Sequence, residues 1–230
     1  MSLEFGLLIV GGYLLGSVPF GYLLVKWLYG IDIRQHGTGK IGASNVMRVA
    51  SRWLSIIVTV LDIGKGALAV WIAQLLELGA AAQVTAGVVT IVGHNWPIFL
   101  GFKGGGRGVF TSLGVITAIS PWLGLIIFVM PYTLAPIKQV ALGVFFALTS
   151  LPVFSWFLNQ PLGIADADRL PVTLGFVALM LVGLLVRVIT PRTQLSQSVP
   201  TVELIFNRLF FDRDIRDRKA WTERKSQGRQ

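Results

Sequence analysis

The segment best suited to chemistry is IDIRQHGTGKIGASNVMR at residues 31–48, which is polar although apolar sequence flanks it on both sides. Its nitrogen-bearing side chains and glycines alternate over a short distance: Arg34, His36, Lys40 and Arg48 with Gly37, Gly39 and Gly42. Glycines let backbone N–H groups come close to an anion, and lysine or arginine adds charge-assisted hydrogen bonds. The combination predicts an anion-binding loop.

A second segment, FKGGGRGV at residues 102–109, has the same composition. Lys103 and Arg107 stand among four glycines: Gly104, Gly105, Gly106 and Gly108. An apolar stretch follows, and the N-terminus of a helix there would add a favourable dipole for an anion. The G-x-x-x-x-G-K-[ST] pattern is absent, so nucleotide hydrolysis is not indicated. Together the two segments predict one phosphate site, although each alone also fits a loop that only sets membrane orientation and turns at its glycines.

Two more polar pairs lie within or beside apolar sequence. Asp62 and Lys65, in LDIGKG, are three residues apart and would share one face of a helix. Ionisable residues in a membrane span usually face the bundle interior, so this pair either supports a substrate pocket or orders the helices as a structural ion pair. His94 and Asn95 precede Pro97 at a helix end, where a histidine is either a base or a hydrogen-bonded helix-end residue.

These residues must be positioned by helices in a membrane. The 230 residues are 53% hydrophobic and 13% charged, whereas soluble domains have about 25% charged residues. Apolar runs, several of them long enough to cross a bilayer, occur at roughly 3–28, 53–78, 80–100, 109–137, 139–158 and 171–190. Glu4 stands where a signal peptide would be basic, so the first run is expected to remain as a helix.

The placement of lysine and arginine predicts the topology. The loops 29–52 and 101–108 and the arginine-rich tail are expected in the cytoplasm, and the acidic connection 159–170 is expected outside. An N-terminus outside and a C-terminus inside require an odd number of crossings, so we split 109–137 near Pro121 and predict seven. The short piece 109–119 is then expected to begin inside the protein, where irregular backbone is tolerated.

We therefore predict an all-α integral membrane domain over residues 1–193 and a basic cytoplasmic tail over residues 194–230. The tail contains LIFNRLFFDRDIRDRKAW, in which phenylalanine and leucine alternate with arginine. That pattern is typical of an interfacial helix on anionic lipid. Because the tail carries much of the net charge of +9, no nucleic-acid partner is expected. The chain has no cysteine and its two histidines, His36 and His94, are far apart, so no metal site is expected.

Taken together, these segments resemble the bacterial membrane glycerol-3-phosphate acyltransferase family that uses acyl phosphate as donor, the PlsY type. The blocks GSVPFGYLLVK, DIRQHGTGKIGASNVMR, LDIGKG, GHNWPIFLGFKGG and GVFTSLGV match the family in order and spacing over roughly residues 10–118. The resemblance implies a seven-helix protein of the bacterial inner membrane with its active site on the cytoplasmic face. It further implies transfer of a fatty acyl group from acyl phosphate to the 1-hydroxyl of glycerol 3-phosphate, giving lysophosphatidic acid for phospholipid synthesis.

The resemblance also implies partners and residue roles. The partners are the two substrates, membrane lipids and other phospholipid-synthesis enzymes, and no cofactor is implied. Catalytic roles fall to Thr38, Arg48 and Arg107. Substrate binding falls to Gly37, Gly39, Lys40, Asn45, Lys103, Gly104, Gly105 and Gly108, and supporting roles fall to Asp62, Lys65, His94 and Asn95. Acyl phosphate carries a good leaving group, so no Ser-His-Asp arrangement is required. A substrate phosphate would accept the hydroxyl proton, and arginine and lysine would stabilise the charge that develops on the leaving group.

The second half follows the family less closely. YTLAPIKQV lacks the family's serines, and LLVRVITPRTQL keeps Arg187 but has Val188 at the position of the family's histidine. Two other functions stay open. One is a non-catalytic relative that binds lipid phosphates or assists assembly. The other is a transporter of phosphorylated solutes, although the internal repeats typical of transporters are not found.

Overall fold

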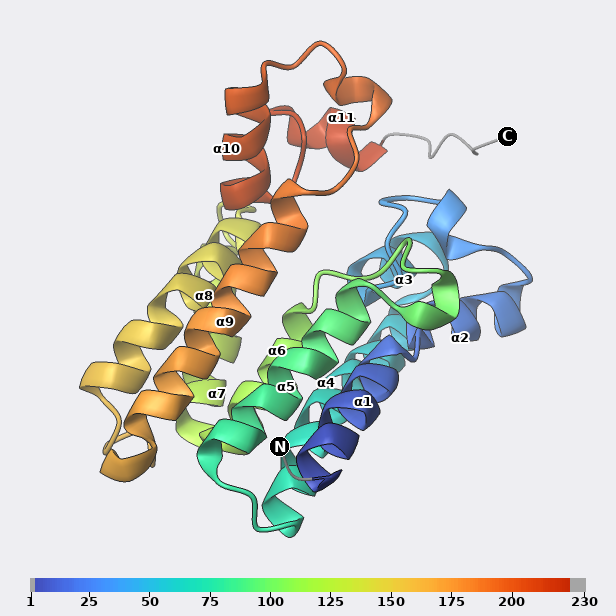
Figure 1. The fold of residues 1–230 in the computed structure, drawn as a ribbon. Coiled ribbons are helices and arrows are strands. Elements are labelled where there is room, and N and C mark those ends of the chain that lie inside the picture. The colour runs from blue at the N-terminus through green and yellow to red at the C-terminus, as the bar shows by residue number, and fades with distance from the viewer. Residues whose placement is uncertain (1–2, 224–230) are drawn as a thin grey trace.

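The computed structural model describes residues 3–223, and all regular structure in that range is helical. The principal helices are α1 (Leu3–Ser17), α2 (Phe20–Tyr29), α3 (Ala43–Val49), α4 (Arg52–Leu75), α5 (Ala80–Asn95), α6 (Val109–Ile119), α7 (Pro121–Val129), α8 (Val140–Phe157), α9 (Arg169–Val188), α10 (Thr201–Phe211) and α11 (Arg218–Glu223). Figure 1 shows α1, α4, α5 and α6 side by side, with α7, α8 and α9 forming the other half of the bundle. Contacts between α5 and α9 join the halves.

Glycines let the helices of the first half approach closely. A Cβ atom on Gly16 of α1 would lie 2.0 Å from the carbonyl oxygen of Thr90 in α5. A Cβ atom on Gly66 of α4 would lie 2.1 Å from the carbonyl oxygen of Thr111 in α6. Because lipid tails are as apolar as leucine, membrane helices gain stability from such close backbone packing. The glycines therefore fix the α1–α5 and α4–α6 pairs.

The first apolar run forms two helices rather than one. α1 ends at Ser17 and α2 begins at Phe20, because Pro19 has no N–H to continue the helical hydrogen bonds. The two helices together still make a candidate span, Leu3–Tyr29. The break leaves backbone carbonyls near Gly16 and Val18 that need a donor from elsewhere.

The predicted break near Pro121 is confirmed. α6 ends at Ile119, the Ser120 Oγ accepts a hydrogen bond from the Leu123 N–H at 3.2 Å, and Pro121 is the first residue of α7. A Cβ atom on Gly124 would lie 2.3 Å from the Thr117 Oγ1, so α6 and α7 turn back on each other as a hairpin.

The expected start of α6 inside the protein is also confirmed. Gly105, Gly106 and Gly108 are buried and carry irregular backbone to the beginning of α6. At 1.5 Å per residue, α6 extends only about 16 Å, roughly half of the hydrocarbon thickness. Within residues 3–223, four segments are long and apolar enough to cross a membrane: Leu3–Tyr29, Arg52–Leu75, Val140–Phe157 and Asp166–Val188. The total of seven crossings stays a prediction.

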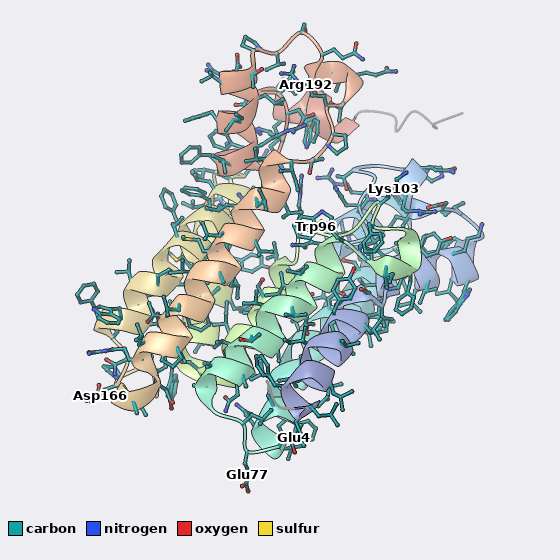
Figure 2. All side chains as sticks on the ribbon, viewed as in Figure 1. Glu4, Glu77, Trp96, Lys103, Asp166 and Arg192 are labelled. Carbon is teal, nitrogen blue, oxygen red and sulfur yellow. The ribbon has the colours of Figure 1, made fainter. Side chains whose placement is uncertain are left out.

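The charged residues divide between the two ends of the bundle. Figure 2 shows Glu4, Glu77 and Asp166 at one end, and Lys103 and Arg192 at the other. This separation is the one that the lysine and arginine pattern predicts for the outer and cytoplasmic faces.

The segment after α9 folds back onto the basic end of the bundle (Figure 1). We call residues 190–221 the C-terminal strap. Its helix α10 packs against α8 and α9, with the rings of Phe210 and Phe145 4.5 Å apart. The buried Arg208 pairs with Asp214 at 2.8 Å and donates to the carbonyl of Val188 at 2.8 Å, so the strap is held to the end of α9. Residues 224–230 of the predicted tail lie outside the described residues.

Candidate functional site

One cavity of about 530 Å³ reaches from the basic end of the molecule into the bundle. Its volume lies within the range of small-molecule sites. Most of its lining comes from the loop 38–48, from α6, from α7 and α8 with the segment between them, and from the C-terminal strap. The predicted site residues that line it are Thr38, Lys40, Asn45, Arg48, Asp62, His94, Arg107 and Gly108.

The first glycine-rich loop is shaped by Asn45. Its Oδ1 accepts the N–H of Thr38 at 2.8 Å, while its Nδ2 donates to the carbonyls of Lys40 at 2.8 Å and His36 at 3.0 Å. Gly37 has a φ of +58°, and a Cβ atom there would lie 2.2 Å from the Asn45 Oδ1. The Asn45 amide is thus used within the loop, so we assign it a loop-shaping role instead of the substrate contact expected from the sequence. Gly37 and Gly39 lie outside the cavity lining and serve the same turn.

The second glycine-rich loop closes onto the end of α5. A Cβ atom on Gly105 would lie 2.0 Å from the Asn95 carbonyl oxygen, and one on Gly106 would lie 1.9 Å from the His94 Nε2. These contacts leave Arg107 and Gly108 at the cavity, whereas Lys103 is exposed and stands outside its lining with Gly104 and Gly105. Gly106, which was not among the predicted binding residues, makes the loop's closest approach to a side chain.

Arg107 connects this loop to the C-terminal part of the chain. Its Nη1 donates to the Val186 carbonyl and to the Thr190 Oγ1, both at 2.6 Å. Its Nη2 forms an ion pair with the Asp212 Oδ1 at 2.8 Å. Asp212 takes the left-handed conformation, with φ of +50°, at the end of α10. The sequence indicated a cation in this loop but not its carboxylate partner more than a hundred residues later.

The pKa of the Lys40 side chain lies close to physiological pH. Burial, followed by the positive charge of Arg107, lowers the pKa of Lys40 from 10.5 to about 8, and Asp212 opposes the shift. At neutral pH the side chain is therefore still mostly protonated and able to hold an anion.

Asp62, Lys65 and His94 form one buried cluster that joins three sequence blocks. The Lys65 Nζ contacts the Asp62 Oδ1 at 2.9 Å and the His94 Nδ1 at 2.8 Å. It also donates to the carbonyls of Gly16 at 3.1 Å and Val18 at 3.2 Å, the groups freed by the α1–α2 break. Lys65 is 3% exposed. The contacts support the structural reading of the pair, because the ammonium group holds α1, α4 and α5 together.

His94 and Asn95 behave differently at the end of α5. His94 uses its Nδ1 in the buried cluster and sets its Nε2 against Gly106, so its contacts are those of a helix-end residue. Asn95 is buried, and neither polar atom of its side chain has a hydrogen-bond partner among the described residues. Its Oδ1 would lie 2.9 Å from a Cβ on Gly108, so it constrains the backbone at the start of α6.

The strap supplies site residues that sequence reasoning missed. Four of its charged side chains line the cavity: Asp212, Arg213, Asp214 and Arg218. Lys138 and Arg187 line it from other elements. The one available signal was the high density of arginine and aspartate after residue 207, which also fits a solvated tail.

Comparison with known proteins gives a consistent family assignment. The model of the family described as glycerol-3-phosphate acyltransferase matches residues 6–197. Glycerol-3-phosphate acyltransferase 4 of Dehalococcoides mccartyi (strain CBDB1) is 42% identical over 97% of this chain and 95% of its own length. Glycerol-3-phosphate acyltransferase 5 of another strain of that species (ATCC BAA-2266 / KCTC 15142 / 195) is 40% identical over 98% of this chain and 96% of its own length.

These two matches extend past the family model. Coverage of 97% of the chain necessarily includes most of residues 198–230, so most of the strap sequence is aligned with those relatives. The glycerol-3-phosphate acyltransferase of Synechococcus sp. (strain CC9902), by contrast, is 43% identical over 66% of this chain and 68% of its own length.

A solved structure shows the same fold. The crystal structure of PlsY (YgiH), an integral membrane glycerol 3-phosphate acyltransferase, in its glycerol 3-phosphate form, superposes with a TM-score of 0.66 and 32% sequence identity. The superposition covers 77% of this chain and 86% of that one. Sequence and structure therefore agree that the chain belongs to the glycerol-3-phosphate acyltransferase family.

Proposed function

We propose that the protein transfers a fatty acyl group from acyl phosphate to the 1-hydroxyl of glycerol 3-phosphate, giving lysophosphatidic acid for phospholipid synthesis. Family membership supports the acceptor and the reaction class, because the relatives are named glycerol-3-phosphate acyltransferases. Acyl phosphate as the donor is the finer part of the proposal.

The observation that carries the proposal is the two-part lining of the cavity. One part of the lining is polar and contains Thr38, Lys40, Arg48 and Arg107. The other part is apolar and comes from α6, α7 and α8, with Phe110, Leu113, Ile116, Ile127, Phe128, Val144 and Leu148. A phosphate group fits the first part and a fatty acyl chain fits the second, so the carbonyl of an acyl phosphate would lie where the two parts meet.

The reaction balances without a further reagent. The 1-hydroxyl oxygen attacks the acyl carbonyl carbon, the bond between that carbon and the bridging phosphate oxygen breaks, and inorganic phosphate leaves. The hydroxyl proton passes to a substrate phosphate, whose second pKa of about 6 suits it as an acceptor. Lys40 and Arg107 stabilise the negative charge that builds up on the departing phosphate. Arg48 neutralises phosphate charge in the same cavity, and Thr38 orients the substrate.

The same proposal includes location and orientation. We place the protein in the bacterial inner membrane with seven crossings, the cavity mouth in the cytoplasm and the N-terminus outside. The separation of Lys103 and Arg192 from Glu4, Glu77 and Asp166 supports this orientation (Figure 2). Reporters placed after Gly30 and after the strap should give the same side and an N-terminal reporter the opposite side. Finding both termini on one side would exclude seven crossings.

The proposal also keeps the division into a membrane domain, residues 1–193, and a C-terminal tail, residues 194–230. Residues 1–193 provide the membrane bundle, and α10 of the segment after it packs against α8 and α9. Val202, Ile205 and Phe206 remain exposed on α10, so we propose that this face rests against lipid at the cytoplasmic surface.

The direct experiment is an assay of purified protein with palmitoyl phosphate and glycerol 3-phosphate, following lysophosphatidic acid, with palmitoyl-CoA in a parallel reaction. Product from palmitoyl phosphate alone is the expected result. Product from palmitoyl-CoA alone would reject the donor. No product from either, with intact glycerol 3-phosphate binding, would favour the non-catalytic alternative, against which the full-length similarity to acyltransferases now counts.

A further inference from the structure

The cavity mouth contains positive charge that the protein itself does not neutralise. Each carboxylate of the lining has a cation already: Asp62 pairs with Lys65, Asp212 with Arg107 and Asp214 with Arg208. Arg48, Arg213 and Arg218 also line the cavity, and within residues 3–223 the side chain of none of them forms a hydrogen bond or an ion pair.

Arg213 is the most informative member of this group. It is 9% exposed, and its Nε is buried with no hydrogen-bond partner among the described residues. The ring of Phe211 lies 4.9 Å from its guanidinium carbon, which holds the side chain in place without neutralising it. A buried cation without a counterion is costly, so such a group is retained where a ligand supplies the missing charge.

The charge of Arg218 acts on both other arginines, although Arg48 comes from a distant part of the sequence. Partial removal of the guanidinium group from water lowers the pKa of Arg48, and the charge of Arg218 lowers it further. Burial and then Arg218 also lower the pKa of Arg213, while Asp217 opposes the shift less strongly. Three guanidinium groups line one cavity and two of them are repelled by Arg218, so a multiply charged anion bound among them would relieve the repulsion.

We propose that Arg48, Arg213 and Arg218 form a second anion subsite at the cavity mouth, which binds the phosphate group of the soluble acceptor. The assignment rests on the proposed function, which requires two phosphate-bearing substrates in one cavity. The donor's phosphate must stay within reach of the apolar part of the cavity because its acyl chain lies there, and Lys40 and Arg107 serve it. The water-soluble acceptor enters at the mouth, and its phosphate remains there while its free hydroxyl points inward.

The subsite makes the strap part of the substrate-binding machinery. Arg213 and Arg218 lie beyond residue 197, where the family model ends, whereas the two Dehalococcoides relatives match through most of that region. The strap therefore contributes two of three acceptor-binding arginines from sequence that the family pattern does not include.

The test compares Arg213→Gln and Arg218→Gln with Arg216→Gln. Arg216 has the same charge and lies in the same segment, but it pairs with Glu203 at the surface and does not line the cavity. KM is measured separately for glycerol 3-phosphate and for palmitoyl phosphate, in nanodiscs of phosphatidylcholine alone and with added phosphatidylglycerol. Calorimetric binding of glycerol 3-phosphate in detergent, without donor, gives a readout independent of turnover, and thermal unfolding reports folding.

We expect Arg213→Gln to raise KM for glycerol 3-phosphate about tenfold or more, because a contact between charged groups is lost. Arg218→Gln should raise it several-fold, because that side chain is exposed and its charge is screened. KM for palmitoyl phosphate and all values for Arg216→Gln should not change. Arg213→Lys keeps the positive charge and should recover part of the affinity. Its recovery would show that the loss in Arg213→Gln comes from the missing charge and not from misfolding.

Three outcomes would overturn the subsite. The first is an unchanged KM and binding constant for glycerol 3-phosphate in both variants. The second is a change in KM for palmitoyl phosphate alone, which would assign the arginines to the donor. The third is a loss confined to phosphatidylglycerol nanodiscs, which would assign them to lipid headgroups. Wild-type protein that binds glycerol 3-phosphate through Arg213 but does not use palmitoyl phosphate would support the subsite and reject the donor instead.

Discussion

Two clusters of charged side chains border the same cavity and are built in opposite ways. In the closed cluster, formed by Asp62, Lys65 and His94, the ammonium group meets a carboxylate, an imidazole and two carbonyls. In the arginine cluster, formed by Arg48, Arg213 and Arg218, no carboxylate or carbonyl of the described residues contacts a guanidinium group. A charged side chain whose partners are all within the protein holds helices together, whereas a charged side chain without such partners is available to bind a ligand.

The largest effect should come from opening the closed cluster. Lys65→Met leaves the Asp62 carboxylate buried without its cation and removes the donor for the carbonyls at the α1–α2 break. Loss of one partner of a buried pair costs about 3–5 kcal/mol, so we expect a large fall in the free energy of unfolding measured in detergent.

Lys26→Met is the matched control, because Lys26 is exposed and its Nζ donates to the Gly30 carbonyl at the end of its own helix. It should change stability by less than about 1 kcal/mol. If Lys65→Met unfolds like wild type and loses only turnover, the closed cluster is catalytic, and its structural role in the comparison with the arginine cluster is rejected.

The next effect tests the arginine cluster from the other side of the cavity. Arg48→Ala should raise KM for glycerol 3-phosphate by roughly 10- to 150-fold, the value of a hydrogen bond to a charged group. The low end is expected, because Arg48 is exposed. Thermal unfolding should not change. Arg52→Ala, an exposed arginine outside the lining, is the control, and equal kinetic losses in both variants would point to general surface charge.

The third prediction concerns the pH dependence caused by Lys40, which belongs to neither cluster. The pKa of Lys40 is lowered to about 8, so the free enzyme loses this positive charge as the pH rises through 8. Phosphate binding requires the protonated amine, and kcat/KM for palmitoyl phosphate should therefore fall about tenfold per pH unit above that value. Lys40→Arg should remove this falling limb within the range tested, because arginine stays protonated. Lys103→Met should retain it, and a limb that persists in Lys40→Arg would assign the titration to another group.

The smallest effect concerns the pair that joins the two sides of the cavity. Asp212→Asn keeps a residue that tolerates the left-handed conformation but removes the charge that Arg107 now contacts. The pair is partly exposed and worth about 1 kcal/mol or less. Release of Arg107 to the substrate should lower KM for palmitoyl phosphate by up to about fivefold. A rise in KM would show instead that Asp212 holds Arg107 in position.

The sequence predicted the first half of the site better than the second, for a physical reason. The loop 31–48 and the loop 102–109 carry their cations and glycines within a few residues, so a local pattern reports a local structure. The helix break at Pro121 and the Asp62–Lys65 contact are local in the same way, and both predictions are confirmed.

The strap was not predictable because its meaning depends on contacts across the whole chain. Asp212 contributes to the site because it pairs with Arg107, and Arg213 contributes because it lines a cavity that α7 and α8 also line. Before folding, the phenylalanines and arginines of this segment describe a surface helix equally well. The convergence of Lys65 with Gly16, Val18 and His94 was hidden likewise, since nothing in three separate blocks states that one ammonium group serves all of them.

The break between α1 and α2 has a consequence for membrane insertion. A helix that enters the bilayer with unpaired carbonyls cannot satisfy them from lipid. The carbonyls of Gly16 and Val18 receive their hydrogen bonds from Lys65, which lies on α4, and Lys65 is neutralised by a carboxylate of α4 and positioned by His94 of α5. The first three hydrophobic segments should accordingly leave the translocon as a group, and α1 released alone into lipid should be a poor substrate for insertion and a good one for quality-control proteolysis.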